Sequence, residues 1–303
     1  MFDPTQRFTG RVHDYIRYRP GYPPEVLDLL RRECNLTESS EFADIGSGTG
    51  ILARLLLDNG NRVVMVEPND EMRQAGERLL SGYRRLDSVA ATAEATGLPQ
   101  GSVDFITVGQ AFHWFDPVAA REEFTWVLRP GGKVMLVWNA RRKAEKPFLE
   151  DYEGLLNAFA TDYLEVEHGK VSCSEAIHNF FAPNDVYTAP FDHTQVLDHD
   201  GLRGRLRSSS YIPAEGAPGY QKMLEELERV FAGMRLVAAS SSNTTRRFTS
   251  GRLRLERARV FDTLVGVQRN ISESLIWGIR EPFASAKVVC GRKVSARSHE
   301  YYR

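Results

Sequence analysis

The stretch from Asp44 to Gly50, with the sequence DIGSGTG, constrains the fold of this 303-residue chain most strongly. It follows the short apolar run EFADI and precedes ILARLLLDNG, which has a helical pattern. A strand that ends in glycine-rich backbone and feeds a helix lets a ligand approach the main chain at the helix N-terminus. The stretch therefore predicts a nucleotide-binding loop in an α/β protein, with a plain glycine turn as the alternative.

Strand-like and helix-like segments alternate around this loop. The strand-like segments are EFADI, RVVMVE, DSVAATAE, SVDFITVG and KVMLVW. Helical periodicity occupies 51–60, 69–80 and 116–128, with Asn69 and Asp116 as expected N-caps. The RPGG stretch before the last strand is expected to be a turn. Five strands separated by helices within about 110 residues predict a parallel sheet that is covered on both faces.

The flanking segments add further helices. Residues 7–23 are expected to form a short aromatic-rich helix that ends at the prolines of RPGYP. The next helix is expected in PPEVLDLLRREC, whose proline suits the first helical position. Beyond the fifth strand, 146–164 and 215–231 have helical patterns and 185–197 has a strand pattern.

The spacing of the glycines separates two classes of adenosine cofactor. A dinucleotide loop follows G-x-G-x-x-G, whereas this loop is G-x-G-x-G and is followed by Ile51. A pyrophosphate gains little from the nearby Asp44, but a cofactor that carries a sulfonium and an ammonium gains from it. Glu67, 21 residues after Gly46, is suited to accept both ribose hydroxyls of either cofactor. An NAD-linked oxidoreductase is therefore the weaker alternative.

The ordered set ADIGSGTG, VEPNDEM, AATAEATGLPQGSVD and LRPGG resembles the class I S-adenosylmethionine-dependent methyltransferases. It is most similar to the small-molecule "type 11" subgroup that includes trans-aconitate methyltransferase-like proteins. The run from Phe8 to Pro23, GQAFHWFD and GRLRSSSYIP also resemble that subgroup, and the resemblance covers about residues 6–232. It implies an α/β fold with a doubly wound, mostly parallel, Rossmann-like sheet, an N-terminal helical lid over 1–23 and S-adenosylmethionine as the cofactor.

The resemblance also implies cofactor-binding roles, residue by residue. Those expected to hold the methionine part are Asp44, Gly46, Ser47, Gly48 and Gly50. Those expected around the ribose and adenine are Glu67, Pro68, Met72, Ala93 and Glu94. Those expected near the sulfonium or in the lid are Gln110, Ala111, Tyr15 and Arg19. Core packing is the alternative for Met72, and a solvated strand end is the alternative for Glu94.

Methyl transfer from a sulfonium is an in-line displacement, so positioning and exclusion of water supply most of the catalysis. A base is needed only for an acceptor that is protonated at neutral pH. His113 follows the fourth strand and is the candidate catalytic residue, as a base or as an orienting group. Trp114, Arg207 and Tyr211 are candidate substrate contacts; the alternatives are that His113 and Trp114 only shape the pocket and that Arg207 is a surface residue.

These features predict methyl transfer to a small molecule, with a carboxylate or hydroxyl oxygen as the acceptor. No [DNS]-P-P-[FYW] motif follows the fourth strand and no Pro-Cys pair is present, which disfavours the known chemistries of nucleic-acid methylation. A protein that binds S-adenosylmethionine without turnover is the main alternative. Three distant cysteines without a CxxC pair predict neither disulfides nor a metal site. Without an h-region or a long apolar run, the expected location is the cytoplasm, with no membrane partner.

The C-terminal segment departs from the family after about Met234. Residues 234–303 hold 14 of the 39 Lys and Arg but only 5 of the 40 Asp and Glu, so the first 233 residues keep 25 basic and 35 acidic side chains. The acidic 1–233 is the expected methyltransferase domain and disfavours a phosphate backbone as partner. The basic 234–303 is either an appendage for RNA or another acidic partner, or the product of a shifted reading frame.

The hypothesis of a shifted frame depends on the family's last antiparallel strand, which has the pattern V-x-Y-D-T-x-V-Y-x-G. Residues 234–303 as written contain no match to this pattern. One permitted back-translation of 241–251, read two bases further on, gives V-E-Y-D-T-A-V-Y-F-G. If the frame is shifted from about Met234 onwards, the sheet is expected to lack its usual last strand.

Overall fold

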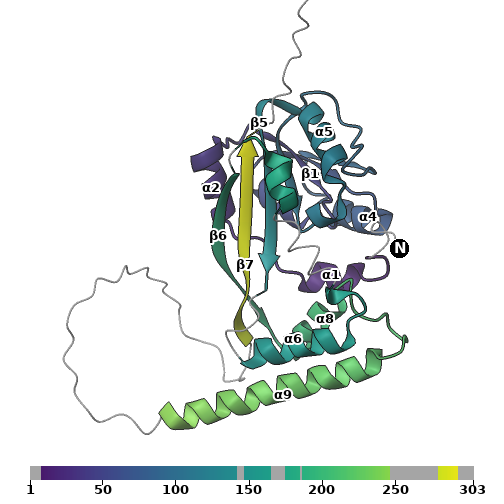
Figure 1. Ribbon diagram of the computed structural model, residues 1–303, viewed down its shortest axis with the longest axis vertical. Helices are drawn as coiled ribbons and strands as arrows, with labels where there is room; N and C mark the ends of the chain where they lie inside the picture. Colours follow the sequence, from purple (N-terminus) through teal and green to yellow (C-terminus); the bar gives the residue numbers. More distant parts are fainter. Residues whose placement is uncertain (1–7, 142–146, 165–174, 185, 246–278, 293–303) are drawn as a thin grey trace, which may run out of the picture.

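The computed structural model describes residues 8–141, 147–164, 175–184, 186–245 and 279–292 (Figure 1). Its helices are α1 (Val12–Tyr18), α2 (Glu25–Cys34), α3 (Ile51–Asp58), α4 (Asp70–Leu79), α5 (Pro117–Val127), α6 (Pro147–Phe159), α8 (His199–Arg207) and α9 (Tyr220–Thr245), with a 3₁₀ turn at Phe112–Trp114. Residues 175–181 are also helical. Its strands are β1 (Glu41–Ile45), β2 (Arg62–Val66), β3 (Leu86–Val89), β4 (Val103–Gly109), β5 (Leu128–Ala140), β6 (Val186–Leu197) and β7 (Ile279–Arg292).

The strands form one sheet in the order β3-β2-β1-β4-β5-β7-β6. The first five strands run parallel, with Asp44 opposite Met65 on β2 and opposite Thr107 on β4. β7 lies antiparallel to both β5 and β6. The carboxyl ends of β1, β2 and β4 therefore meet at one edge, with the strand order reversing beside β1, which is where open α/β sheets bind ligands.

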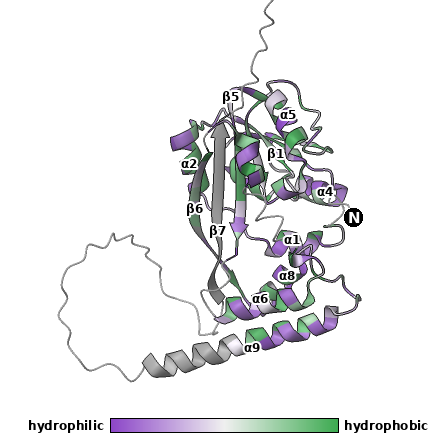
Figure 2. Cartoon of the chain, viewed as in Figure 1, coloured by the Kyte–Doolittle hydropathy of each residue, from purple (hydrophilic) through white to green (hydrophobic). Residues whose placement is uncertain are grey.

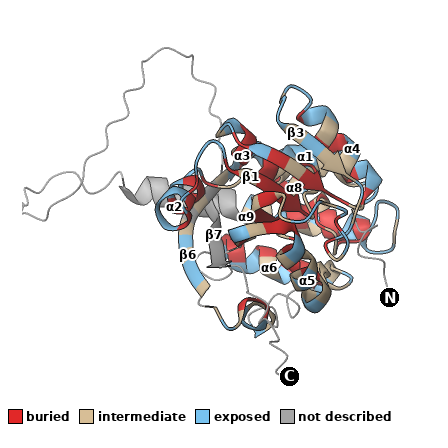
Figure 3. Ribbon diagram, turned by 90° about the horizontal axis from the view of Figure 1, so that it is seen from above, coloured by how far each residue is buried: buried red, intermediate tan, exposed pale blue. Residues whose placement is uncertain are grey.

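Alternation along β1 explains why helices cover both faces of the sheet. Phe42 packs into a core with α2 and α3, whereas Ala43 and Ile45 pack into a second core with α5. All three side chains are fully buried, and Figure 3 shows buried residues concentrated in the central strands. The doubly wound parallel sheet predicted from the sequence is confirmed.

A third hydrophobic cluster lies outside the sheet. It joins α6, α8 and α9, which lie together at the end of β5 with α1 beside α8 (Figure 1). In α9 the buried positions Tyr220, Met223, Leu224, Leu227 and Val230 follow helical spacing, and Figure 2 shows hydrophobic and hydrophilic residues in this part of the helix. These helices cap the carboxyl edge of the parallel strands. Within the described residues, no helix is long and apolar enough to cross a membrane.

The two predicted helix N-caps are confirmed, whereas some expected strand ends and turns differ from those in the structure. Asn69 caps α4 by accepting from Met72 N, and Asp116 caps α5 by accepting from Val118 N and Ala119 N. β3 ends at Val89, short of the expected DSVAATAE, because Thr92 and Ala95 pair with each other in an isolated antiparallel bridge instead of continuing the strand. The expected RPGG turn is instead a bulge within β5, since the pairing passes from Val103–Leu128 to Phe105–Lys133.

The missing last strand, which was expected if the frame is shifted, is not what the structure shows. β7 fills the position between β5 and β6 and pairs with β5 from Lys133–Arg292 to Ala140–Ser285. α9 also extends to Thr245, beyond the expected end at 231. The sequence did not reveal β7 because its residues, IREPFASAKVVCGR, do not match the family's strand motif.

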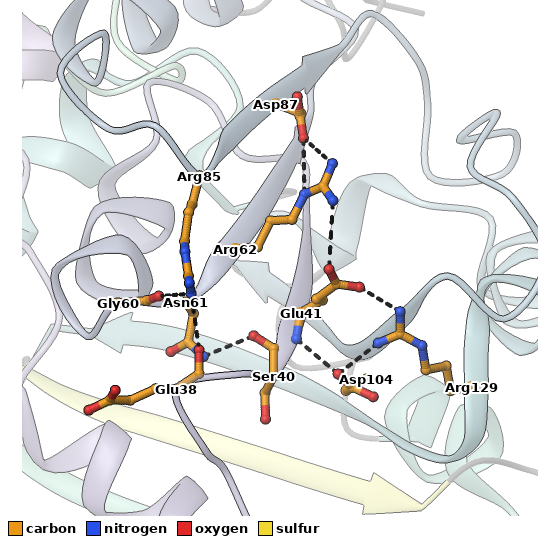
Figure 4. A network of polar contacts seen from close by, with 10 residues as sticks. All are labelled: Glu38, Ser40, Glu41, Gly60, Asn61, Arg62, Arg85, Asp87, Asp104 and Arg129. Atoms are coloured by element: carbon orange, nitrogen blue, oxygen red, sulfur yellow. Dashed lines mark hydrogen bonds and ion pairs between the residues drawn. The ribbon is translucent and has the colours of Figure 1, made fainter.

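A charged network lies at the amino ends of the strands, away from the carboxyl edge (Figure 4). Arg129 Nη1 donates to Asp104 Oδ2 at 2.9 Å and Arg129 Nη2 donates to Glu41 Oε2 at 2.5 Å. Arg62 Nη2 donates to Asp87 Oδ2 at 2.8 Å. Since these side chains are partly or largely exposed, each pair contributes no more than about 1 kcal/mol.

Candidate functional site

The glycine loop joins β1 to α3 and requires glycine for two separate reasons. Gly46 has φ +65° and Gly50 has φ +78°, in the left-handed region that other residues adopt at a cost. A Cβ on Gly46 would lie 2.6 Å from Ala111 Cβ, and one on Gly50 would lie 2.6 Å from Leu80 Cδ1. The loop is therefore fixed by backbone geometry and by close packing against the segments that follow β4 and α4.

Asp44 supports this loop from beneath. Its side chain is 1 % exposed, and Thr107 Oγ1 donates to its Oδ1 at 2.9 Å. Burial raises the pKa of Asp44 to about 7, the bonds from Thr107 and the Ala53 backbone oppose that rise, and the charge of Glu67 adds to it. Because Ala53 N belongs to the first turn of α3, Asp44 also stabilises the helix N-terminus.

Glu67 connects β2 to the glycine loop. Its Oε2 accepts from Gly48 N and its Oε1 accepts from Asn69 N, both at 2.8 Å. The side chain is 8 % exposed, and burial raises its pKa while the two backbone bonds and the charge of Arg73 limit the rise. A carboxylate held at both oxygens is oriented in advance and keeps lone pairs for a ligand's hydroxyl groups.

A single cavity lies above these residues at the carboxyl edge of β1, β2 and β4. It brings together most of the predicted site residues, namely Tyr15, Arg19, Gly46, Gly48, Glu67, Pro68, Met72, Ala93, Glu94, Gln110, Ala111, His113, Trp114 and Tyr211. Residues of the lining that the prediction missed are Phe8, Asn69, Thr92, Gly109, Phe115 and Ser210. Five of these six residues are direct sequence neighbours of a predicted site residue. The sixth, Phe8, begins the run from Phe8 to Pro23 that resembles the family.

The far wall of the cavity comes from the loops that follow β3 and β4. Glu94 Oε1 accepts from Asp116 N at 2.9 Å and so links the β3 loop to the start of α5. Gln110 has φ +62°, which is strained for a residue with a side chain, and its Nε2 donates to Asn139 O at 3.2 Å. Strained backbone of this kind concentrates at ligand-binding sites, and here it lies at the end of β4.

The N-terminal segment covers the cavity. Gly10 N donates to Glu71 Oε2 at 2.8 Å, and the Arg11 guanidinium donates to Arg207 O and Ile212 O at 3.0 and 2.8 Å. The ring of Tyr15 packs edge-on against Phe8 with centroids 5.4 Å apart, and Arg19 Cζ lies 5.0 Å from its centroid. Burial raises the pKa of the Tyr15 phenol, so it stays neutral at physiological pH.

His113 and Trp114 form the 3₁₀ turn after β4 and line the cavity beside Tyr211. The His113 and Trp114 rings contact each other with centroids 4.2 Å apart. The lining of the cavity therefore includes an imidazole and the aromatic side chains of Trp114 and Tyr211. The same cavity is also lined by the acidic residues Glu67 and Glu94.

Four predicted residues do not line this cavity. Asp44 is buried at the end of β1, and Ser47 and Gly50 belong to the loop but are not among the residues that line the cavity. Arg207, expected at the substrate, instead donates through Nε to Asp14 at 2.9 Å and lies 3.7 Å from Glu215. It lines a separate hollow between the lid and the 210–220 segment, because α8 directs it towards α1.

The residues present fit the cofactor that the resemblance implies. Gly48 keeps the loop backbone open towards the cavity, since a Cβ there would lie 3.3 Å from Met72 Cε. Ser47 Oγ is buried and has no hydrogen-bond partner within the described parts of the chain. Carboxylate, glycine backbone and aromatic surface are the groups that a sulfonium nucleoside with ribose hydroxyls would contact.

Comparison with known proteins gives the same assignment. A family model for a methyltransferase domain matches residues 43–136. An uncharacterized methyltransferase of Mycobacterium tuberculosis is 40% identical over 139 residues, covering 46% of this chain and 54% of the relative. The chain thus spans about half the length of the first curated relatives that it matches. A methyltransferase-like protein of Schizosaccharomyces pombe is 32% identical over 232 residues, covering 76% of this chain and 85% of the relative.

Solved structures support the fold. A putative methyltransferase from an antibiotic biosynthesis pathway of Anabaena variabilis matches with a TM-score of 0.53 and 18% identity, over 88% of this chain and 96% of that one. A putative type II methyltransferase of Anaeromyxobacter dehalogenans matches with a TM-score of 0.51 and 20% identity, over 92% of this chain and 100% of that one. With the glycine loop, the cavity at the carboxyl edge and the S. pombe relative, these findings show that the chain belongs to the class I S-adenosylmethionine-dependent methyltransferases.

Proposed function

We propose that this chain transfers a methyl group from S-adenosylmethionine to an oxygen atom of a small-molecule acceptor. The observation that carries the proposal is the cavity itself, into which the glycine loop, Glu67 and the His113–Trp114 turn all open. The lining offers groups for an adenosine and a cation, and it also offers the imidazole of His113 for an acceptor. We assign the activity to the domain formed by residues 1–233, as a relative of the trans-aconitate methyltransferase-like subgroup.

The cofactor-binding roles follow from the contacts. Glu67 is positioned by Gly48 N and Asn69 N, so its free lone pairs would accept from the ribose hydroxyls. Pro68, Met72, Ala93 and Glu94 would surround the adenine and sugar. Gly46, Gly48, Gln110 and Ala111 would hold the methionine part. Asp44 would support the loop from beneath, and Ser47 and Gly50 would maintain its backbone conformation.

S-adenosylmethionine supplies an electrophilic methyl carbon on a sulfonium when it is bound. The chain's task is to orient the acceptor oxygen in line with that carbon and to exclude water, which is worth about 7–11 kcal/mol of barrier. Tyr15 and Arg19 of the lid close the cavity, and the neutral Tyr15 ring would attract the sulfonium by about 0.5–2 kcal/mol. His113 accepts the proton of a hydroxyl acceptor, or donates a hydrogen bond to a carboxylate acceptor that carries none.

The experiment is a transfer assay with tritiated S-adenosylmethionine across carboxylic acids, phenols and quinols. We expect labelled product with at least one class, and His113→Gln is expected to lower kcat by about 100-fold for a hydroxyl acceptor without changing affinity for S-adenosylhomocysteine. Trp126→Phe, an exposed aromatic substitution on α5, is the matched control. S-adenosylhomocysteine binding without transfer to any acceptor would make the chain a binding protein instead.

We also propose that the sequence of 234–303 arises from a shifted reading frame. The family strand recovered by the shift would occupy the position that β7 holds between β5 and β6. Reading the coding DNA tests this directly: codons at 241–251 that are incompatible with V-E-Y-D-T-A-V-Y-F-G in the alternative frame would refute it.

A further inference from the structure

The end of β4 contributes three consecutive residues to the lining of the cavity, namely Gly109, Gln110 and Ala111. The middle one, Gln110, has a left-handed backbone with φ +62°. A residue with a side chain keeps such a conformation only where its surroundings fix the backbone. The contacts made by these three residues therefore determine whether this part of the lining keeps its shape.

Two of the three residues are held by elements next to β4 in the sheet. Ala111 packs closely against the glycine loop, because a Cβ on Gly46 would lie 2.6 Å from Ala111 Cβ. Gln110 N donates to Val137 O at 2.9 Å, and Gln110 Nε2 donates to Asn139 O at 3.2 Å. The strained residue and its C-terminal neighbour are thus fixed by β5 and by the glycine loop.

Gly109 is held by Tyr22, which lies in the segment between α1 and α2. A Cβ on Gly109 would lie 2.7 Å from Tyr22 Oη, and 3.3 Å from both Tyr22 Cζ and Leu52 Cδ2. The phenol therefore occupies the space that a side chain at Gly109 would fill. Leu52 is buried in the core formed with α2 and α3, and Tyr22 packs against the same core, so packing fixes the position of the phenol.

The chain just before Tyr22 is anchored to the antiparallel half of the sheet. Asn139 Nδ2 donates to Gly21 O at 3.0 Å, so this asparagine of β5 contacts both the strained end of β4 and the segment that follows the lid. On β6, Gln195 Nε2 donates to Tyr18 O at 2.8 Å, at the end of α1. Tyr22 is therefore a fixed support for Gly109.

Tyr22 is not among the residues that line the cavity, and its phenol stays protonated at physiological pH. Burial raises the pKa of Tyr22 well above its usual value, and nearby Tyr15 and Asp44 raise it further. The positive charge of Arg19 opposes this rise without cancelling it. A neutral phenol outside the lining acts on a ligand only through Gly109, so Tyr22 is a positioning residue and not a base.

We propose that Tyr22 supports Gly109 from outside the cavity and so keeps the strained end of β4 in the conformation that binds S-adenosylmethionine. The inference rests on the proposed function, because it concerns the methyl donor in the same cavity. Without the phenol, the backbone from Gly109 to Ala111 would relax towards an unstrained conformation and the lining would change shape. The segment between the lid and α2 would thus shape the cofactor site besides connecting two helices.

Calorimetric titration of the full chain with S-adenosylhomocysteine tests this inference. Gly109→Ala places a methyl group where Tyr22 Oη lies, and we expect it to weaken binding by about tenfold or more. Tyr22→Phe in the same chain removes the hydroxyl group that the methyl group meets, so the double variant is expected to regain most of the lost affinity. Gly82→Ala, at a glycine with open space around the Cβ position, is the matched control and is expected to bind as the wild type does.

Tyr22→Leu tests the same support without any change in β4. It removes the phenol and frees the backbone at Gly109, so we expect binding to weaken by about tenfold. Tyr187→Leu, at an exposed tyrosine of β6, is the matched control and is expected to leave the affinity unchanged. Urea unfolding of each variant gives its folded fraction, and affinities are compared for folded protein, so a loss of stability alone does not lower the measured affinity.

The failure of this inference is distinguishable from the failure of the proposed function. Wild-type affinity in Gly109→Ala or in folded Tyr22→Leu would overturn the inference alone. A double variant that binds no better than Gly109→Ala would also overturn it, because the phenol would then not be what holds Gly109. If the wild type itself does not bind S-adenosylhomocysteine, the proposed function fails.

Discussion

Gly46→Ala tests the geometry of the glycine loop because two separate penalties can be worked out for it. An alanine at φ +65° costs about 1–2 kcal/mol for the left-handed backbone. Its Cβ would lie 2.6 Å from Ala111 Cβ and 3.3 Å from Phe115 Cζ, and overpacking of this kind costs about 1–3 kcal/mol. We therefore expect the free energy of unfolding to fall by about 2–5 kcal/mol, with a large loss of affinity for S-adenosylhomocysteine.

The second penalty can be removed separately. Ala111→Gly deletes the Cβ that the new side chain would meet, so the double variant should recover the overpacking part and retain about 1–2 kcal/mol of backbone cost. Urea unfolding of the wild type, both single variants and the double variant gives the coupling energy. Additive single effects, with no recovery in the double variant, would refute the packing between the loop and the segment after β4.

Two further predictions concern buried carboxylates. Because the folded chain raises the pKa of Asp44 from 3.8 to about 7, the native state holds a proton that the unfolded chain loses between these values. The contribution of Asp44 to the free energy of unfolding therefore declines as pH rises from about 4 to 7. Asp44→Asn should remove this part of the pH dependence, which urea unfolding at several pH values measures. The same pH dependence in the wild type and in Asp44→Asn would contradict the raised pKa. Glu153→Gln leaves Arg141 without its carboxylate and should cost about 3 kcal/mol, whereas Asp87→Asn in the exposed pair with Arg62 should cost less than about 1 kcal/mol. Equal costs would show that burial does not strengthen the Arg141 pair.

The sequence predicted the features that depend on short-range chemistry. The strand–loop–helix order, the N-caps Asn69 and Asp116, and the glycine spacing all depend on neighbours within a few positions. The same local patterns placed Glu67 at the end of β2, beside the loop. Because parallel strands bring their carboxyl ends to one edge, these local signals were enough to predict that the glycine loop and Glu67 line one cavity.

The rest of the cavity wall could not be predicted to the same extent, because it depends on contacts between distant segments. Arg19 and Tyr211 both line the cavity although they lie far apart in the sequence, and nothing local shows that Arg207 pairs with Asp14 instead of lining the same cavity. β7 was missed for a related reason. It pairs with β5 and β6 across a large sequence separation, and its residues do not carry the family's strand motif.

The central claim is that the cavity holds S-adenosylmethionine, and calorimetric titration tests it most directly. We predict that S-adenosylmethionine and S-adenosylhomocysteine bind with one site per chain and that NAD does not bind. Glu67→Gln is expected to weaken binding by about tenfold, because its amide nitrogen cannot accept from the loop and the ribose together. Binding of NAD without S-adenosylhomocysteine, or equal affinities in the wild type and Glu67→Gln, would contradict the account.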